Sequence, residues 1–191
     1  MKLKDIVELT AMLVNAYSVI DSGVFNSDTT EQTYQTIYNN NADLRLIVKC
    51  AQLVLDETAC DYAPIYKTET LNTTNGKILF SSLTERICEP IAIHHLEMNV
   101  PFDIYPDRIE TYTGTVDFTY AYIPAKKNFF DTIIASTRIT DRAIAYGAAA
   151  EFYLNKGQTD FALMWDKRYK DALSLLFSQR RYKPMPHPRW F

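Results

Sequence analysis

The hydrophobic pattern changes its period twice along the chain, and this change constrains the fold more than any other feature. Apolar residues recur at intervals of three and four from Leu44 to Tyr62, which is typical of a helix. From Ile65 to Pro124 the chain has short runs of β-branched and aromatic residues, typical of strands. After Thr140 the helical spacing returns. We therefore predict an α+β fold, with terminal helices that bundle together and an inserted antiparallel β lobe.

The N-terminal part of the chain is expected to be helical. Asp28 lies three residues before Glu31, and this capping-box-like pair predicts the start of a short helix over residues 33–38. Pro64 is expected to end the long helix that follows. An apolar stripe predicts an earlier helix that ends at residues 21–23, and its members are Ile6, Leu9, Leu13, Ala16 and Ile20.

Two patterns in the middle of the chain predict particular strands. Residues 65–71 and 77–80 are extended in character and are separated by turn residues at 72–76, so we expect them to form a β-hairpin. The clearest alternation indicates a half-buried strand. Its inner face would carry Val116, Phe118, Tyr120 and Tyr122.

The last two helices are predicted to form a helical hairpin. Thr140 is a good N-cap, and Ile139 with Ile144 would form the hydrophobic staple around it. Gly157 is expected to cap the far end of this helix. The final helix is predicted over residues 159–178 and would pack back on the previous one, because the connection is short. Its predicted inner face carries Phe161, Trp165, Tyr169, Ala172 and Leu176.

Residues 179–191 differ from the rest of the chain. They carry basic side chains and no acidic one, and alternating prolines favour an extended conformation. Such an arm is either a flexible terminus or a docking segment, in which cations pair with acids and aromatic rings fill pockets on a partner. The candidate partner-binding residues are Arg180, Arg181, Tyr182, Lys183, Arg189, Trp190 and Phe191.

These elements divide the chain into four expected segments. The first helices of the bundle occupy residues 1–63, and the inserted β lobe occupies residues 64–124. The closing helical hairpin covers residues 125–178, and the extended arm covers residues 179–191.

Charge and hydropathy exclude several classes of protein. The formal net charge of -3 gives no overall attraction to nucleic acid or to an anionic membrane. No apolar run reaches the roughly 18 residues of a membrane-spanning helix, so no membrane partner is expected. The first residues mix polar and apolar side chains, a pattern that does not predict a secretory signal.

The sequence carries no familiar catalytic motif. A nucleophile elbow, a phosphate-binding loop, a dinucleotide-binding glycine pattern and a zinc-protease motif are all missing, so we expect neither enzymatic activity nor a cofactor. His94 and His95 would point to opposite faces of a strand, so no metal site is expected there. A deep pocket with either histidine beside carboxylates would instead indicate a small hydrolase.

The three cysteines are expected to be reduced thiols. Their odd number and wide spacing do not suggest a disulfide framework or a zinc site. Cys50 and Cys60 would be about 15 Å apart on one helix, too far for a disulfide. The remaining thiol is that of Cys88, and all three are interpreted as small buried hydrophobic groups.

Two groups of segments carry a resemblance to a known family. The first group consists of residues 77–86, 101–107 and 116–124. The second consists of residues 143–154 and Gly157, followed by Ala162, Trp165, Tyr169, Ala172 and Leu173. In these segments, the chain from about Leu44 to Leu176 resembles the head–tail adaptor (connector) family of tailed bacteriophages, of the tail-tubular type. That family has a β region ending in an aromatic-rich strand and a proline, and a closing helical hairpin.

The resemblance implies a structural protein of the virion neck, made in the host cytoplasm. It implies a homo-oligomeric ring, twelve-fold like the portal, with the portal protein on one side and tail or neck proteins on the other. DNA would pass through the channel of the ring without sequence recognition. The residues of the arm would anchor the ring to its partner.

Two other interpretations remain open from the residues alone. The chain could be a nucleic-acid-binding or regulatory module that uses the basic arm, since arginines interleaved with aromatic rings can grip a backbone and stack on bases. It could also be another phage or cellular assembly protein. Salt-dependent retention on DNA would favour the first of these.

Overall fold

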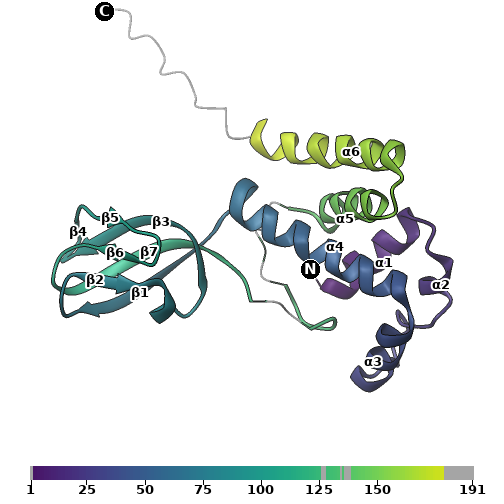
Figure 1. Cartoon of the computed structure of the whole chain (residues 1–191), viewed down its shortest axis with the longest axis horizontal. Helices are drawn as coiled ribbons and strands as arrows, with labels where there is room; N and C mark the ends of the chain where they lie inside the picture. The colour runs from purple at the N-terminus through teal and green to yellow at the C-terminus, as the bar shows by residue number, and fades with distance from the viewer. Residues whose placement is uncertain (1, 126–127, 134, 136–138, 179–191) are drawn as a thin grey trace, which may run out of the picture. The chain divides into compact units, whose positions relative to one another are not determined.

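The computed structural model describes residues 2–125, 128–133, 135 and 139–178. The chain forms two compact units, one of Met1–Ala51 with Thr137–Phe191 and one of Gln52–Ser136. The first unit is built from helices and the second chiefly from strands (Figure 1). The predicted α+β class, with terminal helices and an inserted antiparallel β lobe, is therefore confirmed.

The helices come from both ends of the chain. They are α1 (Leu3–Leu13), α2 (Tyr17–Ile20), α3 (Glu31–Asn40), α4 (Ala42–Glu57), α5 (Asp141–Asn155) and α6 (Thr159–Ser178). The last turns of α4, from Gln52 onward, belong to the second unit. A π-helical stretch, η1 (Thr58–Tyr62), continues α4 and ends just before Pro64, the predicted stop.

The predicted first helix is in fact two helices. Asn15 has a backbone φ of 54° and breaks the helix, and asparagine is one of the few residues that adopts this conformation readily. The predicted stripe is also wrong in part, because Leu9 is exposed. The side chains that α1 buries are Leu3, Ile6, Val7, Thr10 and Ala11.

The start of α3 is capped by a different residue from the one predicted. The Thr30 hydroxyl accepts a hydrogen bond of 3.3 Å from the backbone N–H of Thr33, whereas Asp28 lies further upstream. The helix is accordingly longer than the predicted 33–38. Asn41 then caps α4, since its side-chain oxygen accepts a 3.0 Å hydrogen bond from the Leu44 N–H.

The closing hairpin of α5 and α6 agrees with the prediction. The Thr140 hydroxyl accepts a hydrogen bond of 3.2 Å from the Ala143 N–H. Gly157 has a φ of 73° and ends the hairpin's first helix, where the Gln158 N–H bonds the Tyr153 carbonyl at 2.9 Å. The second helix covers the predicted residues, and the two helices lie side by side (Figure 1).

Small residues let α5 pack against both α1 and α6. Its buried positions are Ala143, Ile144, Ala145, Gly147, Ala148, Ala149, Ala150 and Phe152. The α6 side chains that are buried are Ala162, Trp165, Tyr169 and Leu173. Phe161, predicted on this inner face, is 53% exposed instead.

The β lobe consists of two antiparallel sheets. Its strands are β1 (Ile65–Thr73), β2 (Lys77–Leu79), β3 (Arg86–His95), β4 (Met98–Asn99), β5 (Asp103–Ile104), β6 (Arg108–Glu110) and β7 (Gly114–Ile123). The larger sheet has the order β1-β7-β3-β4, and the smaller has the order β2-β6-β5. One hydrophobic core takes side chains from both sheets, and its buried members are Ile78, Ile93, Ile109, Val116, Phe118, Tyr120 and Tyr122. The predicted inner face of β7 is thus confirmed.

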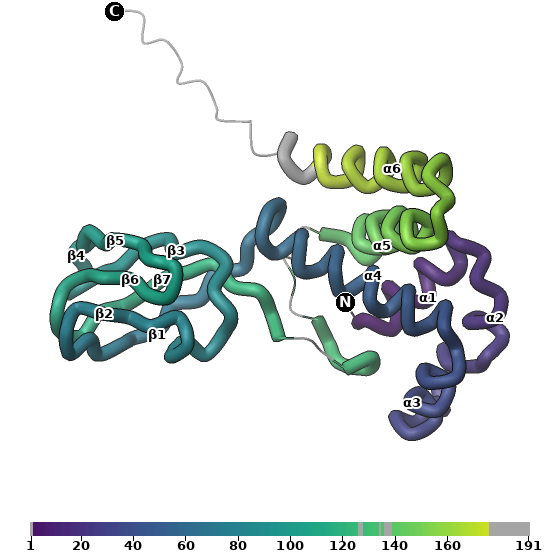
Figure 2. Tube along the Cα trace, viewed as in Figure 1, coloured from purple at the N-terminus to yellow at the C-terminus, as the bar shows by residue number. Residues whose placement is uncertain are grey.

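The predicted hairpin of β1 and β2 is wrong. β1 pairs with β7 from Ile65 opposite Tyr122 to Thr73 opposite Gly114, and β2 pairs with β6 in the other sheet. Figure 2 shows the trace leaving β1, running through the intervening strands and returning as β7. The long β7 can satisfy the whole nine-residue ladder of β1, whereas β2 has only three residues.

Candidate functional site

The predicted partner-binding residues lie outside the part of the chain that the structure describes. These are Arg180, Arg181, Tyr182, Lys183, Arg189, Trp190 and Phe191. Their role in binding stays a prediction. Candidate sites within the described residues are a hollow in the helical unit, a polar network in the β lobe and an exposed apolar stripe.

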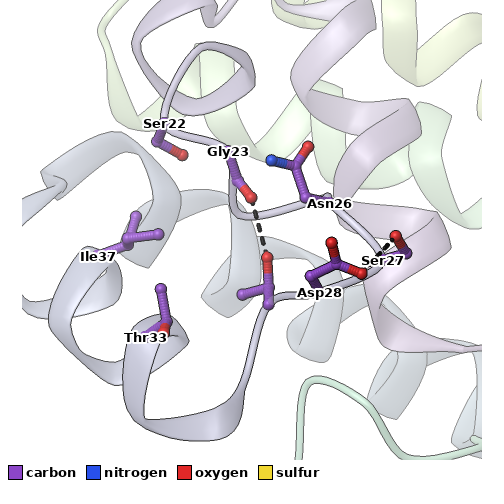
Figure 3. Close-up of a pocket in the computed structure, with 8 residues that line it drawn as sticks. Ser22, Gly23, Asn26, Ser27, Asp28, Thr33 and Ile37 are labelled. Atoms are coloured by element: carbon purple, nitrogen blue, oxygen red, sulfur yellow. Dashed lines mark hydrogen bonds between the residues drawn. The ribbon is translucent and has the colours of Figure 1, made fainter.

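A hollow of about 440 Å³ lies beside the connection from α2 to α3 (Figure 3). Its lining is mostly hydroxyl and amide groups, from Ser22, Gly23, Asn26, Ser27, Asp28, Thr29, Thr33 and Ile37. The Thr29 hydroxyl donates a 3.0 Å hydrogen bond to the Gly23 carbonyl across it, and the exposed Ser27 hydroxyl donates one of 3.0 Å to Asp28. This lining offers hydrogen bonds to a small polar group but no histidine and no cation.

The two neighbouring histidines lie at the end of β3. His94 is opposite Asn99 and His95 is opposite Met98 in the β3–β4 ladder, so their side chains alternate between faces. The Nδ1 atom of His95 is 2.8 Å from the Thr115 carbonyl oxygen, a contact that links the end of β3 to the start of β7. Within residues 2–125, 128–133, 135 and 139–178, no three His, Cys, Asp or Glu side chains are placed to hold a metal ion.

A polar network joins β1, β7 and the segment just before β3. Lys67 and Glu69 lie on the inward side of β1, the same side as Ile65 and Leu71. The Lys67 ammonium is 3.3 Å from the Glu69 carboxylate, whose side chain is only 11% exposed. This network was not expected from the sequence, although the alternation of β1 places the two charges on the same face as its apolar residues.

Donors around Glu69 keep its carboxyl group ionised. The Tyr120 hydroxyl donates a 2.5 Å hydrogen bond to it, and the Thr84 hydroxyl donates another. Burial would raise the pKa of Glu69, but the hydrogen bonds from Thr84, Tyr120 and Lys67 outweigh it and hold that pKa below its ordinary value. Burial and the bond to Glu69 raise the pKa of Tyr120 to about 12.

This arrangement supports structure rather than proton transfer. An ionised carboxylate with its acceptor positions filled and a phenol with a raised pKa are both held in one protonation state near neutral pH. β1 is an edge strand of the larger sheet, and inward-pointing charges on an edge strand disfavour pairing with another chain. We therefore interpret the network as a feature that keeps the edge strand β1 from pairing with a strand of another chain.

An exposed apolar stripe runs along α6. Phe161, Met164 and Leu175, called here the α6 stripe, are 53%, 42% and 66% exposed. Their spacings of three and eleven residues place them on one side of the helix, next to its buried face. Phe161 also stacks on Tyr153 of α5, with ring centroids 5.3 Å apart. The stripe is a surface that a protein partner can cover.

A second group of exposed apolar side chains lies at the β3–β4 turn. Leu96 is 79% exposed and Met98 is 66% exposed. Leu96 and Glu97 both have positive φ, at 48° and 66°, which holds the turn in a conformation that L-residues seldom adopt. Each of the two units therefore presents large apolar groups to solvent.

No described helix combines the length and the apolar character needed to cross a membrane. A comparison with known protein families found no family that matches the chain, and a comparison with curated proteins found no similar sequence.

Proposed function

We propose that the chain is a structural virion protein that forms the head–tail adaptor ring between the portal and the tail of a tailed bacteriophage. Support comes from the family resemblance of segments that lie in the β lobe and the closing hairpin. Residues 77–86, 101–107 and 116–124 belong to the lobe, and residues 143–154 form most of α5. The chain acts as a building block and not as an enzyme.

The α6 stripe is the observation that carries this proposal. A protein that assembles into a ring needs large apolar side chains outside its own core, at positions that a neighbour can cover. Complete burial of a side chain such as Phe161, Met164 or Leu175 contributes about 1.5–3 kcal/mol, and these three are about half exposed or more. The stripe lies on a regular helix, which offers a rigid contact surface.

A closed ring needs two different faces on each subunit, because its contacts run head to tail. The α6 stripe supplies one apolar face. The β3–β4 turn, with Leu96 and Met98, supplies exposed apolar groups for contacts with a neighbouring subunit or with the tail. The charged network on β1 favours contacts through side chains over sheet extension.

The remaining partners follow from the same proposal. The basic and aromatic residues of the arm, from Arg180 to Phe191, anchor the ring to the portal protein. Tail or neck proteins bind the opposite face, and DNA passes through a channel. The net charge of -3 suits a channel that lets DNA slide, because it provides no overall attraction to phosphates. The ring is twelve-fold, like the portal that it meets, and is assembled from chains made in the host cytoplasm.

Light scattering of the full chain tests this proposal. The mass is measured over a range of concentrations, alone and after mixing with the portal ring encoded in the same phage genome, and the mixture is imaged by negative stain. A ring, alone or seeded by the portal, supports the proposal. A monomer with no affinity for the portal overturns it, and retention on DNA that falls steeply with salt then identifies a nucleic-acid-binding module.

A further inference from the structure

A cation lies within the α6 stripe. Arg168 is four residues after Met164 and seven before Leu175, and these spacings place it on the same side of the helix. Its side chain is exposed, and the central carbon of its guanidinium lies 4.7 Å from the centre of the buried Trp165 ring. Stacking on an aromatic ring leaves the N–H groups at the edge of a guanidinium able to donate to a carboxylate. Arg168 is therefore a positioned cation between exposed apolar side chains.

This cation is not neutralised within the described part of the chain. The ion pair along α6 joins Lys170 to Asp166, and no ion pair among the described residues includes Arg168. A protein that covers the stripe would bury the guanidinium, and a buried charge is costly unless an opposite charge pairs with it. The surface that fits the stripe should therefore carry an acid flanked by apolar side chains.

The β3–β4 turn of the same chain has this complementary pattern. Glu97 is exposed and lies between Leu96 and Met98, which are 79% and 66% exposed. The positive φ angles of Leu96 and Glu97 fix the shape of the turn. Among the described residues, no ion pair includes Glu97. The turn thus offers a carboxylate between two apolar groups.

Another exposed acid of the β lobe fits less well. Asp103 of β5 is next to Ile104, which is 61% exposed. On its other side is Phe102, which packs against the core of the lobe. Asp103 therefore lacks an exposed apolar group on both sides, and it provides a matched control for Glu97.

We infer that the β3–β4 turn of one subunit docks on the α6 stripe of a second copy of the chain, where Glu97 pairs with Arg168. This inference rests on the proposed ring and names the two faces that meet at each contact. Leu96 and Met98 pack on the apolar side chains of the stripe. The turn and the stripe are different surfaces, so the contact is head to tail, and contacts of this kind close a ring when the rotation allows it.

The charge pair determines where the turn sits on the stripe. Apolar contacts alone are compatible with several positions along a helix, because they are not directional. Opposite charges that meet at one point suppress the other positions, and like charges placed there oppose association. Reversal of either charge should therefore weaken the contact more than its removal.

A charge exchange between two full-length variants tests the inference. Sedimentation velocity measures the association of E97R and R168E, alone and with the portal ring. Each variant by itself should associate roughly tenfold or more weakly than the wild type. An equal mixture of the two should associate to within about threefold of the wild type, because every contact in an alternating ring again joins opposite charges. Recovery in the mixture also shows that the contact is between chains and not within one.

Two exposed positions supply the controls. K167E changes the cation next to Arg168, on a different side of α6, and D103R changes the other exposed acid. A mixture of K167E with E97R, or of D103R with R168E, should stay weak. Circular dichroism checks that each variant folds. The uncharged variants E97Q and R168Q decide the matter if a reversed variant misfolds, since the double variant should then be no weaker than either single one.

The outcomes separate this contact from the proposed ring. Assembly of the wild type that is insensitive to E97R or R168E, or that their mixture does not recover, overturns the contact and leaves the ring in place. A wild-type chain that stays monomeric, alone and with the portal, overturns the ring and the contact together.

Discussion

The hydroxyl group of Tyr120 donates a hydrogen bond to the carboxylate of Glu69, so a side chain of the lobe's core is tied to a charge on the edge strand β1. The Tyr120 ring is fully buried, and its oxygen is satisfied through this carboxylate. The stability of the β lobe should depend on Glu69 more than on any exposed acid.

Replacement of Glu69 by alanine should lower the free energy of unfolding by about 1–3 kcal/mol, because it deprives Tyr120 and Thr84 of their acceptor. Chemical denaturation followed by near-UV circular dichroism measures the change. The matched control is E97A, at an exposed turn position. Equal effects of the two substitutions would contradict the structural role of the network.

The same carboxylate predicts a dependence of stability on pH. The pKa of Glu69 is lower in the folded protein than in the unfolded chain, so the folded protein gains stability from its ionised form. This contribution is fully present above the ordinary glutamate pKa of about 4.3 and is lost as the pH falls through the lower, folded value. Melting temperatures between neutral and acidic pH should show a loss that is smaller in E69Q. A parallel pH profile for E69Q would contradict the assignment.

Two glycines with similar backbone angles should respond differently to alanine. Gly157 has a φ of 73° and nothing within 4 Å of an added Cβ, so G157A should cost only the conformational penalty of about 1–2 kcal/mol. Gly76 has a φ of 65°, and an added Cβ would overlap the Thr111 carbonyl oxygen, so G76A should cost about 2–4 kcal/mol. Urea unfolding compares the two, and a smaller effect of G76A would contradict the packing described at this turn.

The α6 stripe predicts which substitutions weaken self-association. F161K and M164K should each lower the association constant at least tenfold while leaving the helical content unchanged, because both side chains are already exposed in the single chain. L163K is the matched control, since Leu163 is 66% exposed on a different side of α6. Sedimentation velocity measures the change. Equal weakening by L163K would show that charge alone, and not the stripe, is responsible.

Removal of residues 179–191 should separate folding from partner binding. α6 ends at Ser178, so the truncated chain should keep the circular dichroism spectrum and melting temperature of the full chain. Its affinity for the portal ring should be lost if the arm is the anchor. A chain with the arm residues in scrambled order controls for charge and composition. Undiminished portal binding by the truncated chain would assign the anchor to another surface.

Local signals in the sequence were sufficient for the closing hairpin. The Thr140 cap and the Gly157 end depend on hydrogen bonds within a few residues of each other, so their sequence pattern specifies them directly. The alternation of β7 was equally informative, because one buried face imposes a period of two.

Features that depend on distant parts of the chain could not be predicted in this way. The turn at Gly76 suggested a hairpin, but the partner of β1 is chosen by the length and inner face of β7. Glu69 is an intermediate case. The alternation of β1 could predict which face of the strand it lies on, but not that Tyr120 and Thr84 donate hydrogen bonds to it.

During synthesis on a ribosome, β1 emerges well before its partner. Its ladder runs only to β7, so none of its sheet hydrogen bonds can form until residue 114 and those after it have left the exit tunnel. Pairing at such a separation is slow, because the intervening chain must first be brought together. In that interval Ile65 and Leu71 lack their core and Lys67 and Glu69 lack Tyr120, so the nascent lobe depends on those two charges to keep neighbouring chains apart.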